Sequence, residues 1–479
     1  MTSDVEIQPA AEPSPPPPAA SRTWPALRSL LLRLHFYAGI LVAPFLLVAA
    51  TSGLLYAASF QLERLVYAHE LTVPAQGAAG LTLSQQVAAA QAARPEGTVA
   101  AVRPAAEPGE TTRVLLDVPG MADSTRLAVF VHPGTGEIRG AMESYGSSGA
   151  LPVRTWISGL HRNLHLGEPG RIYSELAASW LWVVALGGLV LWLSRRRRQG
   201  RRLRGALVPE RGVTGIRRAL SWHGSVGLWA VLGLLFLSAT GLTWSKYAGG
   251  NVDVLQGALG WSTPSLSTST SIATPVTPPS TPPASSGDHS AHSGVRSGAQ
   301  RSATPVGVDQ VVRAAAAEGL SGPLEITWPA EPGGAYVVKE MDRTWPQRND
   351  QVAVDSLGGQ VVGVLRFDDF PIGAKLTRWG IDGHMGLLFG LPNQILLAAL
   401  AAGLVSVIVL GYRMWWLRGP VRGFGAPYGR GGLRRLPWPP VALLAVAVVA
   451  VGIFLPLLGI SLLAFLVLDV VLGRVRSAR

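Results

Sequence analysis

Two histidines each begin an apolar stretch of membrane-spanning length, and both are followed by glycines at the same spacing. In each stretch one glycine stands four residues after the histidine and another stands eighteen residues after it. The residues are His35, Gly39 and Gly53 in the first stretch and His223, Gly227 and Gly241 in the second. These spacings are about one and about five turns of an α-helix, so each histidine shares a helix face with its glycines. Two matching triplets indicate an internal repeat.

A second pair of histidines precedes two further apolar stretches. The segment LHRNLHLGEPGR comes before one of them, and GHMGLLFGLPNQ comes before the other. Aligning their Gly-x-Pro motifs matches His161 with His384, each six residues before the glycine. His165 aligns with Leu388, so the repeat favours His161 over His165 as the equivalent residue.

Histidines at membrane helices are suited to ligating a haem iron. Ionisable side chains are rare in membrane segments and usually mark function. A neutral imidazole is a good axial ligand, and two imidazoles from facing helices can hold one iron from both sides. Glycines on the same face remove bulk where a porphyrin or a neighbouring helix would approach. The predicted axial ligands are His35 and His223 near the cytoplasmic face and His161 and His384 near the outer face, with clearance at Gly39, Gly53, Gly227 and Gly241.

Other interpretations of these histidines stay open. An interfacial histidine is usually only part of an amphipathic belt, and small residues in a span more often form helix-packing seams. A proton relay or a metal permease would need polar residues in the middle of its spans, and the four apolar stretches contain few of them. His69 and His132 lie outside the repeat and are expected at the surface. His289 and His292 are expected in a solvated linker rather than in a metal site, because a rigid site needs more ligands.

The composition indicates a membrane protein with soluble parts. The 479 residues are 48% hydrophobic, with mean hydropathy +0.29. The absence of cysteine excludes disulfides, thiolate-ligated haem and Cys-ligated iron–sulfur clusters. The net charge of +12 does not indicate nucleic-acid binding, because arginines gather between two apolar stretches at 195–218, where Glu210 is the single acidic residue. That pattern is typical of a short cytoplasmic loop.

The fold class that follows is an α-helical membrane protein with a four-helix transmembrane core. Two tandem repeats, each with the order span, small domain, span, would build this core. Arginines precede the first span, so the N-terminus is predicted to be cytoplasmic. The predicted spans are 34–59, 173–194, 222–244 and 390–417; residues 1–21 are a predicted disordered tail, and 195–221 a basic cytoplasmic loop.

Two extracytoplasmic segments, 60–172 and 245–389, resemble each other. Each has a helix-like stretch followed by alternating apolar residues and turns, which favours one helix and then short antiparallel strands. We therefore expect two small α+β domains. Residues 262–303, rich in Ser, Thr and Pro, are predicted to be a flexible linker before the second of them. The apolar stretch 441–472 is too long for one upright span, and a helical hairpin is favoured over one tilted helix.

The span starts, the LHRNLHLGEPGR segment and the returning span with GHMG and RMWW resemble the PepSY-associated transmembrane family over about 30–420. The two α+β segments look like PepSY domains. That family includes iron-regulated bacterial membrane proteins and inner-membrane ferrisiderophore reductases that carry two haems. The resemblance therefore implies two b-type haems, with His35, His161, His223 and His384 as ligands. The long linker and the C-terminal hydrophobic hairpin are departures from the family pattern.

The sequence therefore predicts a dihaem protein of the cytoplasmic membrane that passes electrons outward, to ferric iron in a chelate or siderophore. No Gly-x-Gly-x-x-Gly motif follows a strand in the cytoplasmic loops, so the electron donor is expected to be quinol or a reductase partner. Whether the chain is itself an oxidoreductase is left open, and no catalytic side chain is predicted. The alternative function is a membrane-anchored PepSY adaptor or inhibitor that binds an extracytoplasmic protein without redox activity. A visible-absorption spectrum would distinguish the two.

Overall fold

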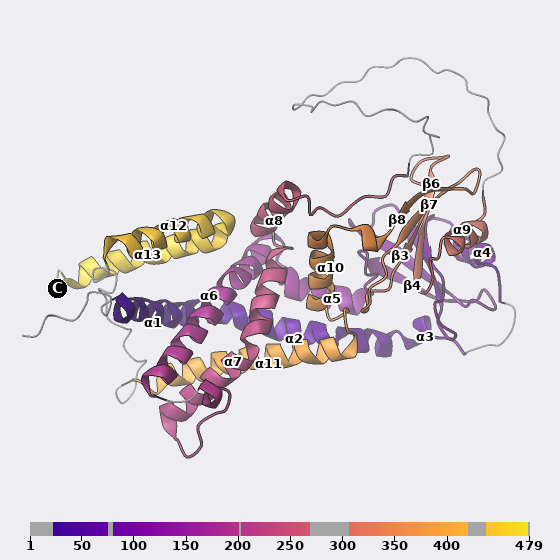
Figure 1. Cartoon of the computed structure of the whole chain (residues 1–479). Coiled ribbons are helices and arrows are strands. Elements are labelled where there is room, and N and C mark those ends of the chain that lie inside the picture. The colour runs from indigo at the N-terminus through magenta and orange to yellow at the C-terminus, as the bar shows by residue number, and fades with distance from the viewer. Residues whose placement is uncertain (1–22, 75–79, 201–202, 269–305, 420–436, 478–479) are drawn as a thin grey trace, which may run out of the picture. The chain divides into compact units, whose positions relative to one another are not determined.

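The computed structural model describes residues 23–74, 80–200, 203–268, 306–419 and 437–477 (Figure 1). The chain divides into two compact units. The first, called here the helical unit, is drawn from Met1–Thr51, Asn163–Val252 and Ala399–Arg479. The second, called the sheet unit, is drawn from Ser52–Arg162 and Asp253–Ala398.

Within these described ranges, four helices are long and apolar enough to cross a membrane. They are α2 (Ala43–Val66), α6 (Glu168–Arg198), α7 (Gly215–Leu242) and α11 (Leu391–Trp416). They correspond to the four stretches expected from the sequence. The helix α1 (Thr23–Leu41) precedes α2, so the predicted span 34–59 covers the end of one helix and the start of the next.

The break between α1 and α2 has a local cause in Pro44. Proline has no backbone N–H, so it cannot donate to the carbonyl four residues earlier, that of Ile40. The Tyr412 hydroxyl donates to that Ile40 oxygen instead, at 2.9 Å. The Tyr173 hydroxyl donates to the Pro44 oxygen at 3.2 Å. Side chains of α11 and α6 therefore satisfy backbone groups at the junction, which fixes α1 with its histidine in the helical unit.

Helices α6 and α7 pack closely at a glycine. A Cβ at Gly224 of α7 would overlap the ring of Trp192 on α6, so only glycine allows this approach. The Trp192 indole donates to Ala206 O at 3.3 Å, in the short helix η2 (Leu203–Ala206) of the basic loop. Glu210, the one acidic residue of that loop, lies 3.8 Å from the buried Arg196 guanidinium. The loop is thereby held against the ends of α6 and α7.

Residues 441–472 fall within two helices, α12 (Trp438–Phe454) and α13 (Pro456–Ser477). The chain leaves the first helix at Leu455, and Pro456 begins the second. Gly452 and Gly459 bring the two helices together, since a Cβ at Gly459 would be 2.8 Å from the Gly452 Cα. The Trp180 indole on α6 donates to Ser461 Oγ at 2.9 Å, which joins this pair of helices to the helical unit.

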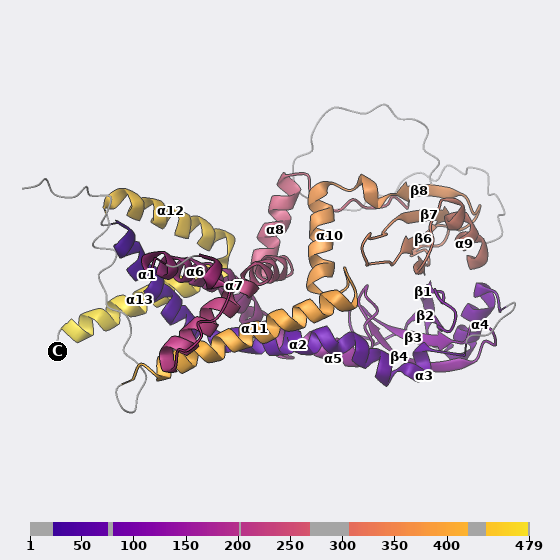
Figure 2. The ribbon, with the colours of Figure 1, turned by 60° about the horizontal axis from the view of Figure 1, so that its bottom comes forward.

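The sheet unit contains one antiparallel sheet of eight strands in the order β4-β3-β2-β1-β5-β6-β7-β8 (Figure 2). The helix α4 (Leu83–Ala93) precedes four of the strands, and α9 (Val308–Ala317) precedes the other four. The strands are β1 (Thr98–Arg103), β2 (Thr112–Asp117), β3 (Thr125–Val131), β4 (Ile138–Tyr145), β5 (Leu324–Thr327), β6 (Ala335–Glu340), β7 (Gln351–Asp355) and β8 (Val361–Leu365). The remaining helices are α3 (Ala68–Leu71), α5 (Pro152–Asn163), α8 (Tyr247–Ala258), η3 (Phe367–Asp369) and α10 (Ile372–His384).

The two α+β segments thus share a sheet, whereas the sequence suggested two separate domains. Strand β1 pairs with β5 through Ala101↔Thr327 and Val102↔Ile326. Each would otherwise be an edge strand with unpaired backbone groups, so the pairing covers both edges at once. Val102 and Ile326 are fully buried, and they belong to one apolar core with Val311 of α9.

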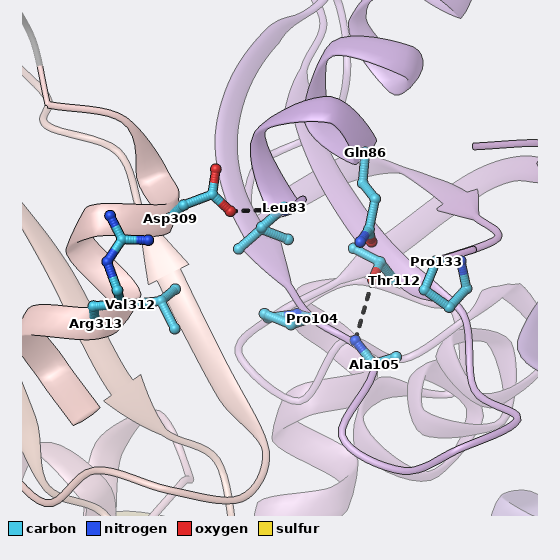
Figure 3. Close-up of a pocket in the computed structure, with 9 residues that line it drawn as sticks. All are labelled: Leu83, Gln86, Pro104, Ala105, Thr112, Pro133, Asp309, Val312 and Arg313. Carbon is cyan, nitrogen blue, oxygen red and sulfur yellow. Dashed lines mark hydrogen bonds between the residues drawn. The ribbon is translucent and has the colours of Figure 1, made fainter. Parts of the chain in front are cut away.

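Helices α4 and α9 are also joined by a carboxylate. Asp309 accepts hydrogen bonds from the backbone N–H of Leu83 at 2.8 Å and of Ser84 at 3.2 Å, and from the Ser84 hydroxyl. These are N–H groups of the first turn of α4, which have no partner within the helix. Beside them is a small cavity of about 250 Å³ (Figure 3). None of the histidines lines it, and the Gln86 amide points into it from α4.

We expect Asp309→Ala to destabilise the sheet unit by about 1 kcal/mol, as the loss of a helix N-cap does. Burial raises the pKa of Asp309, but hydrogen bonds from Ser84 and Leu83 outweigh it and lower that pKa below 3.8. The stabilisation is therefore present at neutral pH. It is lost as the pH falls first through 3.8, the ordinary pKa of an aspartate, and then through the lower pKa of Asp309 in the folded protein. Faster amide hydrogen exchange at Leu83 and Ser84 in the full-length protein is the measurement. Asp123→Ala, at an exposed aspartate, is the control, and equal exchange in both variants would contradict the prediction.

Candidate functional site

His35 of α1 and His223 of α7 face each other within the helical unit, and we call them the inner pair. Their ring centroids are 6.2 Å apart, and the ring planes are inclined at 85°. Each ring also lies against a glycine of another helix. A Cβ at Gly188 of α6 would be 3.0 Å from the His35 Cε1 atom, and one at Gly411 of α11 would be 3.7 Å from the His223 Cε1 atom. Glycine at position 188 lets the His35 imidazole approach the backbone of α6, whereas a Cβ at position 411 would make only an ordinary contact with His223.

The hydrogen bonds of the inner pair fix which nitrogen is available. The Nδ1 atom of His223 is 2.9 Å from the carbonyl oxygen of Val407 on α11. A carbonyl only accepts, so Nδ1 carries the proton and the Nε2 lone pair is free to ligate. The Nδ1 atom of His35 is buried, and the backbone of Val184 lies near it without meeting hydrogen-bond geometry. It is a buried polar atom that the described residues leave unsatisfied.

His161 and His384 face each other within the sheet unit, and we call them the outer pair. Their ring centroids are 6.5 Å apart, with the ring planes inclined at 50°. The His161 Nδ1 atom is 3.0 Å from the Ser52 hydroxyl, and a Cβ at Gly53 would be 3.2 Å from its Cε1 atom. The Tyr56 ring stacks on the imidazole at 6.4 Å. Three residues of one face of α2 thus position His161.

His384 is positioned by the turn in which it lies, at the end of α10. The Asp382 carbonyl accepts from Leu387 N at 2.8 Å, and the Asn393 amide donates to Gly383 O at 3.0 Å. Burial, and then the neighbouring His161, lower the pKa of His384 to about 3. The imidazole is therefore neutral at physiological pH, which is the form that ligates a metal ion.

The other histidines that the structure describes do not join either pair. His165 follows α5 at an exposed position with φ of 54°, and His69 is exposed. His132 was expected at the surface, and this expectation was wrong, because its side chain is buried. Its Nδ1 atom accepts from Gly134 N at 3.0 Å in the turn after β3, so the ring is held beneath that turn. His289 and His292 lie outside the described residues.

The predicted clearance glycines differ in what surrounds them. A Cβ at Gly39 or at Gly227 would meet no atom within 4 Å, so protein packing does not require glycine there. A Cβ at Gly53 would make a tight contact with the His161 ring, at 3.2 Å from Cε1. Gly241 lies in the last turn of α7.

The sequence analysis missed Gly188 and Gly411, which lie against the inner pair. The Gly-x-Pro alignment contains the signal for them. Gly188 is 21 residues after Gly167, and Gly411 is 21 residues after Gly390. Val184 and Val407, whose backbones lie next to the two imidazoles, each stand four residues before one of these glycines.

A known protein family matches most of the chain. The model of the PepSY-associated TM region matches residues 32–418, which is most of the chain. The chain belongs to the PepSY-associated transmembrane family. All four paired histidines lie within the matched residues, whereas α12 and α13 lie beyond them. No curated protein sequence is significantly similar to the chain. The protein is a membrane protein whose spanning helices contact lipid.

Proposed function

We propose that this PepSY-associated membrane protein holds two b-type haems and transfers electrons across the cytoplasmic membrane. The observation that carries the proposal is the occurrence of two facing histidine pairs, with ring centroids 6.2 and 6.5 Å apart. Haem at each pair would supply an iron that gains and loses one electron.

The spacing of each pair fits an iron between the two rings. An imidazole nitrogen lies about 2 Å from a metal ion that it ligates, and its ring centre lies about 1.1 Å behind it, so the two histidines of each pair could hold one iron between them. The inner pair is at 6.2 Å and the outer pair at 6.5 Å.

The surroundings of the inner pair support the same assignment. The His223 Nδ1–H donates to a backbone carbonyl, as metal-ligating histidines almost always do, and this orients Nε2 as the ligand. The open faces at Gly39 and Gly227 leave room for a flat macrocycle one helical turn from each histidine. The apolar helices around His35 and His223 would keep water from the iron.

The arginine distribution supports a direction. Arg195, Arg196, Arg197 and Arg198 end α6, and basic residues are concentrated on the cytoplasmic side of membrane proteins. The N-terminus and the loop between α6 and α7 then face the cytoplasm, and the sheet unit faces outward. The donor is quinol or a reductase partner on the cytoplasmic side, and the acceptor is a ferric chelate or ferric siderophore outside. Such an acceptor is too polar to cross the apolar layer, which is a reason to export the electron.

Replacement of each ligand should remove one haem and leave the other. His35→Ala and His223→Ala should both lose the inner haem, and His161→Ala and His384→Ala the outer one, because each iron would lose one of its two ligands. Haem content per chain and the low-spin absorption bands of the purified variants are the measurements. His69→Ala, at an exposed histidine, is the control, and His165→Ala should retain more haem than His161→Ala. Full haem retention in His161→Ala with loss in His165→Ala would refute the assignment of the outer pair.

Electron export can be tested with the protein in liposomes. Haem reduced from the side of the basic loop should be reoxidised quickly by ferric chelates added on the side of the sheet unit, and slowly without them. Stopped-flow absorption of the reduced haem band gives both rates. His384→Ala should lose this reoxidation while its inner haem remains reducible. Equal reoxidation rates with and without ferric chelate would refute ferric chelates as the acceptor. The protein would then transfer electrons to another acceptor.

A further inference from the structure

Three aromatic side chains of the sheet unit lie together beside the start of α11, and we call them the aromatic patch. They are Trp345 in the loop between β6 and β7, Trp379 of α10, and Phe389 in the turn before α11. The Trp345 ring centroid is 5.1 Å from that of Trp379 and 6.5 Å from that of Phe389. Trp345 is 54% exposed and Phe389 is 55% exposed. Aromatic side chains that gather on a surface mark an interaction site more often than scattered ones do.

The loop that carries Trp345 is held in place by hydrogen bonds. The Trp345 backbone N–H donates to Leu388 O at 2.7 Å, which ties the loop to the turn before α11. Two residues later, the side chain of Gln347 is buried, and its amide donates to the Asp382 carboxylate on α10. The exposed position of the Trp345 ring is therefore a built feature of the loop.

Behind its exposed rings, the aromatic patch packs on a buried apolar cluster. The Trp379 ring centroid is 6.2 Å from that of Phe367. Phe367 is buried together with Phe370 and Ala374. One side of the aromatic patch thus packs on the protein, and Trp345 and Phe389 form its open side.

The span α11 indicates what covers the open side. It begins at Leu391, two residues after Phe389. Its 26 residues are about 39 Å long, whereas a hydrocarbon core is about 30 Å thick and a bilayer with its headgroups about 40–45 Å. An upright helix of this length has both ends at headgroup level, and the aromatic patch lies beside one of them. The exposed side chains of Leu391 and Ile395 continue the apolar surface onto the span.

We propose that the aromatic patch lies in the lipid interface beside α11, so that the loop between β6 and β7 anchors the sheet unit to the membrane. Tryptophan is favoured at this depth, because its ring is apolar while its indole N–H stays within reach of water and lipid headgroups. The partner is the bilayer itself. The proposal needs only α11 as a span, and it depends neither on haem nor on the direction of electron transfer.

The opposite end of β7 provides a matched control. The strand leaves the Trp345 loop at Gln351 and reaches the next turn after Asp355, so its length of about 15 Å separates the loop from that turn. Leu357 in this turn is also an exposed apolar residue. Anchoring through the Trp345 loop should bring lipid to Trp345 and leave Leu357 in water.

The test uses site-directed spin labels on the full-length chain, which has no cysteine of its own. Trp345→Cys, Leu357→Cys and Ile395→Cys each carry one nitroxide, in nanodiscs that hold one copy of the protein. Power-saturation electron paramagnetic resonance measures collisions with oxygen, which concentrates in lipid, and with a nickel chelate, which stays in water. The oxygen-to-nickel collision ratio at position 345 should be several-fold higher than at 357 and closer to that at 395. Equal ratios at 345 and 357 would overturn the proposal.

A second measurement keeps the tryptophan in place. Wild-type protein is irradiated in bilayers containing a phospholipid with a photoactivatable group near its glycerol backbone, and adducts are mapped by mass spectrometry. The peptide with Trp345 should carry lipid, and the peptide with Leu357 should not. Adducts at Ile395 without any at Trp345 would also overturn the proposal.

A second copy of the chain is the rival occupant of the aromatic patch. One copy per nanodisc removes this contact, so a high oxygen-to-nickel ratio at position 345 in these discs supports lipid. If the position 345 label is shielded from nickel only in liposomes with many copies, a protein interface covers the aromatic patch and the lipid anchor is refuted.

Discussion

The structure depends on bringing two imidazoles next to each other within an apolar protein, and on doing so in two places. A buried imidazole needs a partner for each polar nitrogen, because an unsatisfied buried group is costly. At the inner pair, the Val407 carbonyl satisfies one nitrogen of His223. At the outer pair, the Ser52 hydroxyl does the same for His161. A metal ion held between the rings, as we propose, would be ligated by imidazole nitrogens of each pair.

Glycine makes this approach possible. The His35 ring lies against Gly188, and the His161 ring lies against Gly53. A Cβ would lie 3.0 Å from His35 Cε1 at the first position and 3.2 Å from His161 Cε1 at the second, so the imidazole would have to shift by a few tenths of an ångström. Pro44 and the hydroxyls of Tyr173 and Tyr412 fix the angle at which α1 enters, and so the direction of His35. The sheet unit supplies α5 and α10, whose last turns carry the outer histidines.

Much of this arrangement could be predicted from the sequence because it repeats. The matching of His161 with His384 needed only the Gly-x-Pro alignment, and the spans followed from hydropathy. The pairing of β1 with β5 could not be predicted, since more than 200 residues separate them and the alternation of apolar residues does not say which edges meet. His132 was misplaced because a turn of backbone N–H groups, invisible in the residue pattern, encloses its ring.

The spin state of the iron in the oxidised wild-type protein tests the central claim most directly. Two haems per chain, both low-spin and both with the near-infrared magnetic circular dichroism of two imidazole ligands, are what the two histidine pairs predict. Purified protein with no haem, or with one high-spin haem bound by a single histidine, would contradict the account.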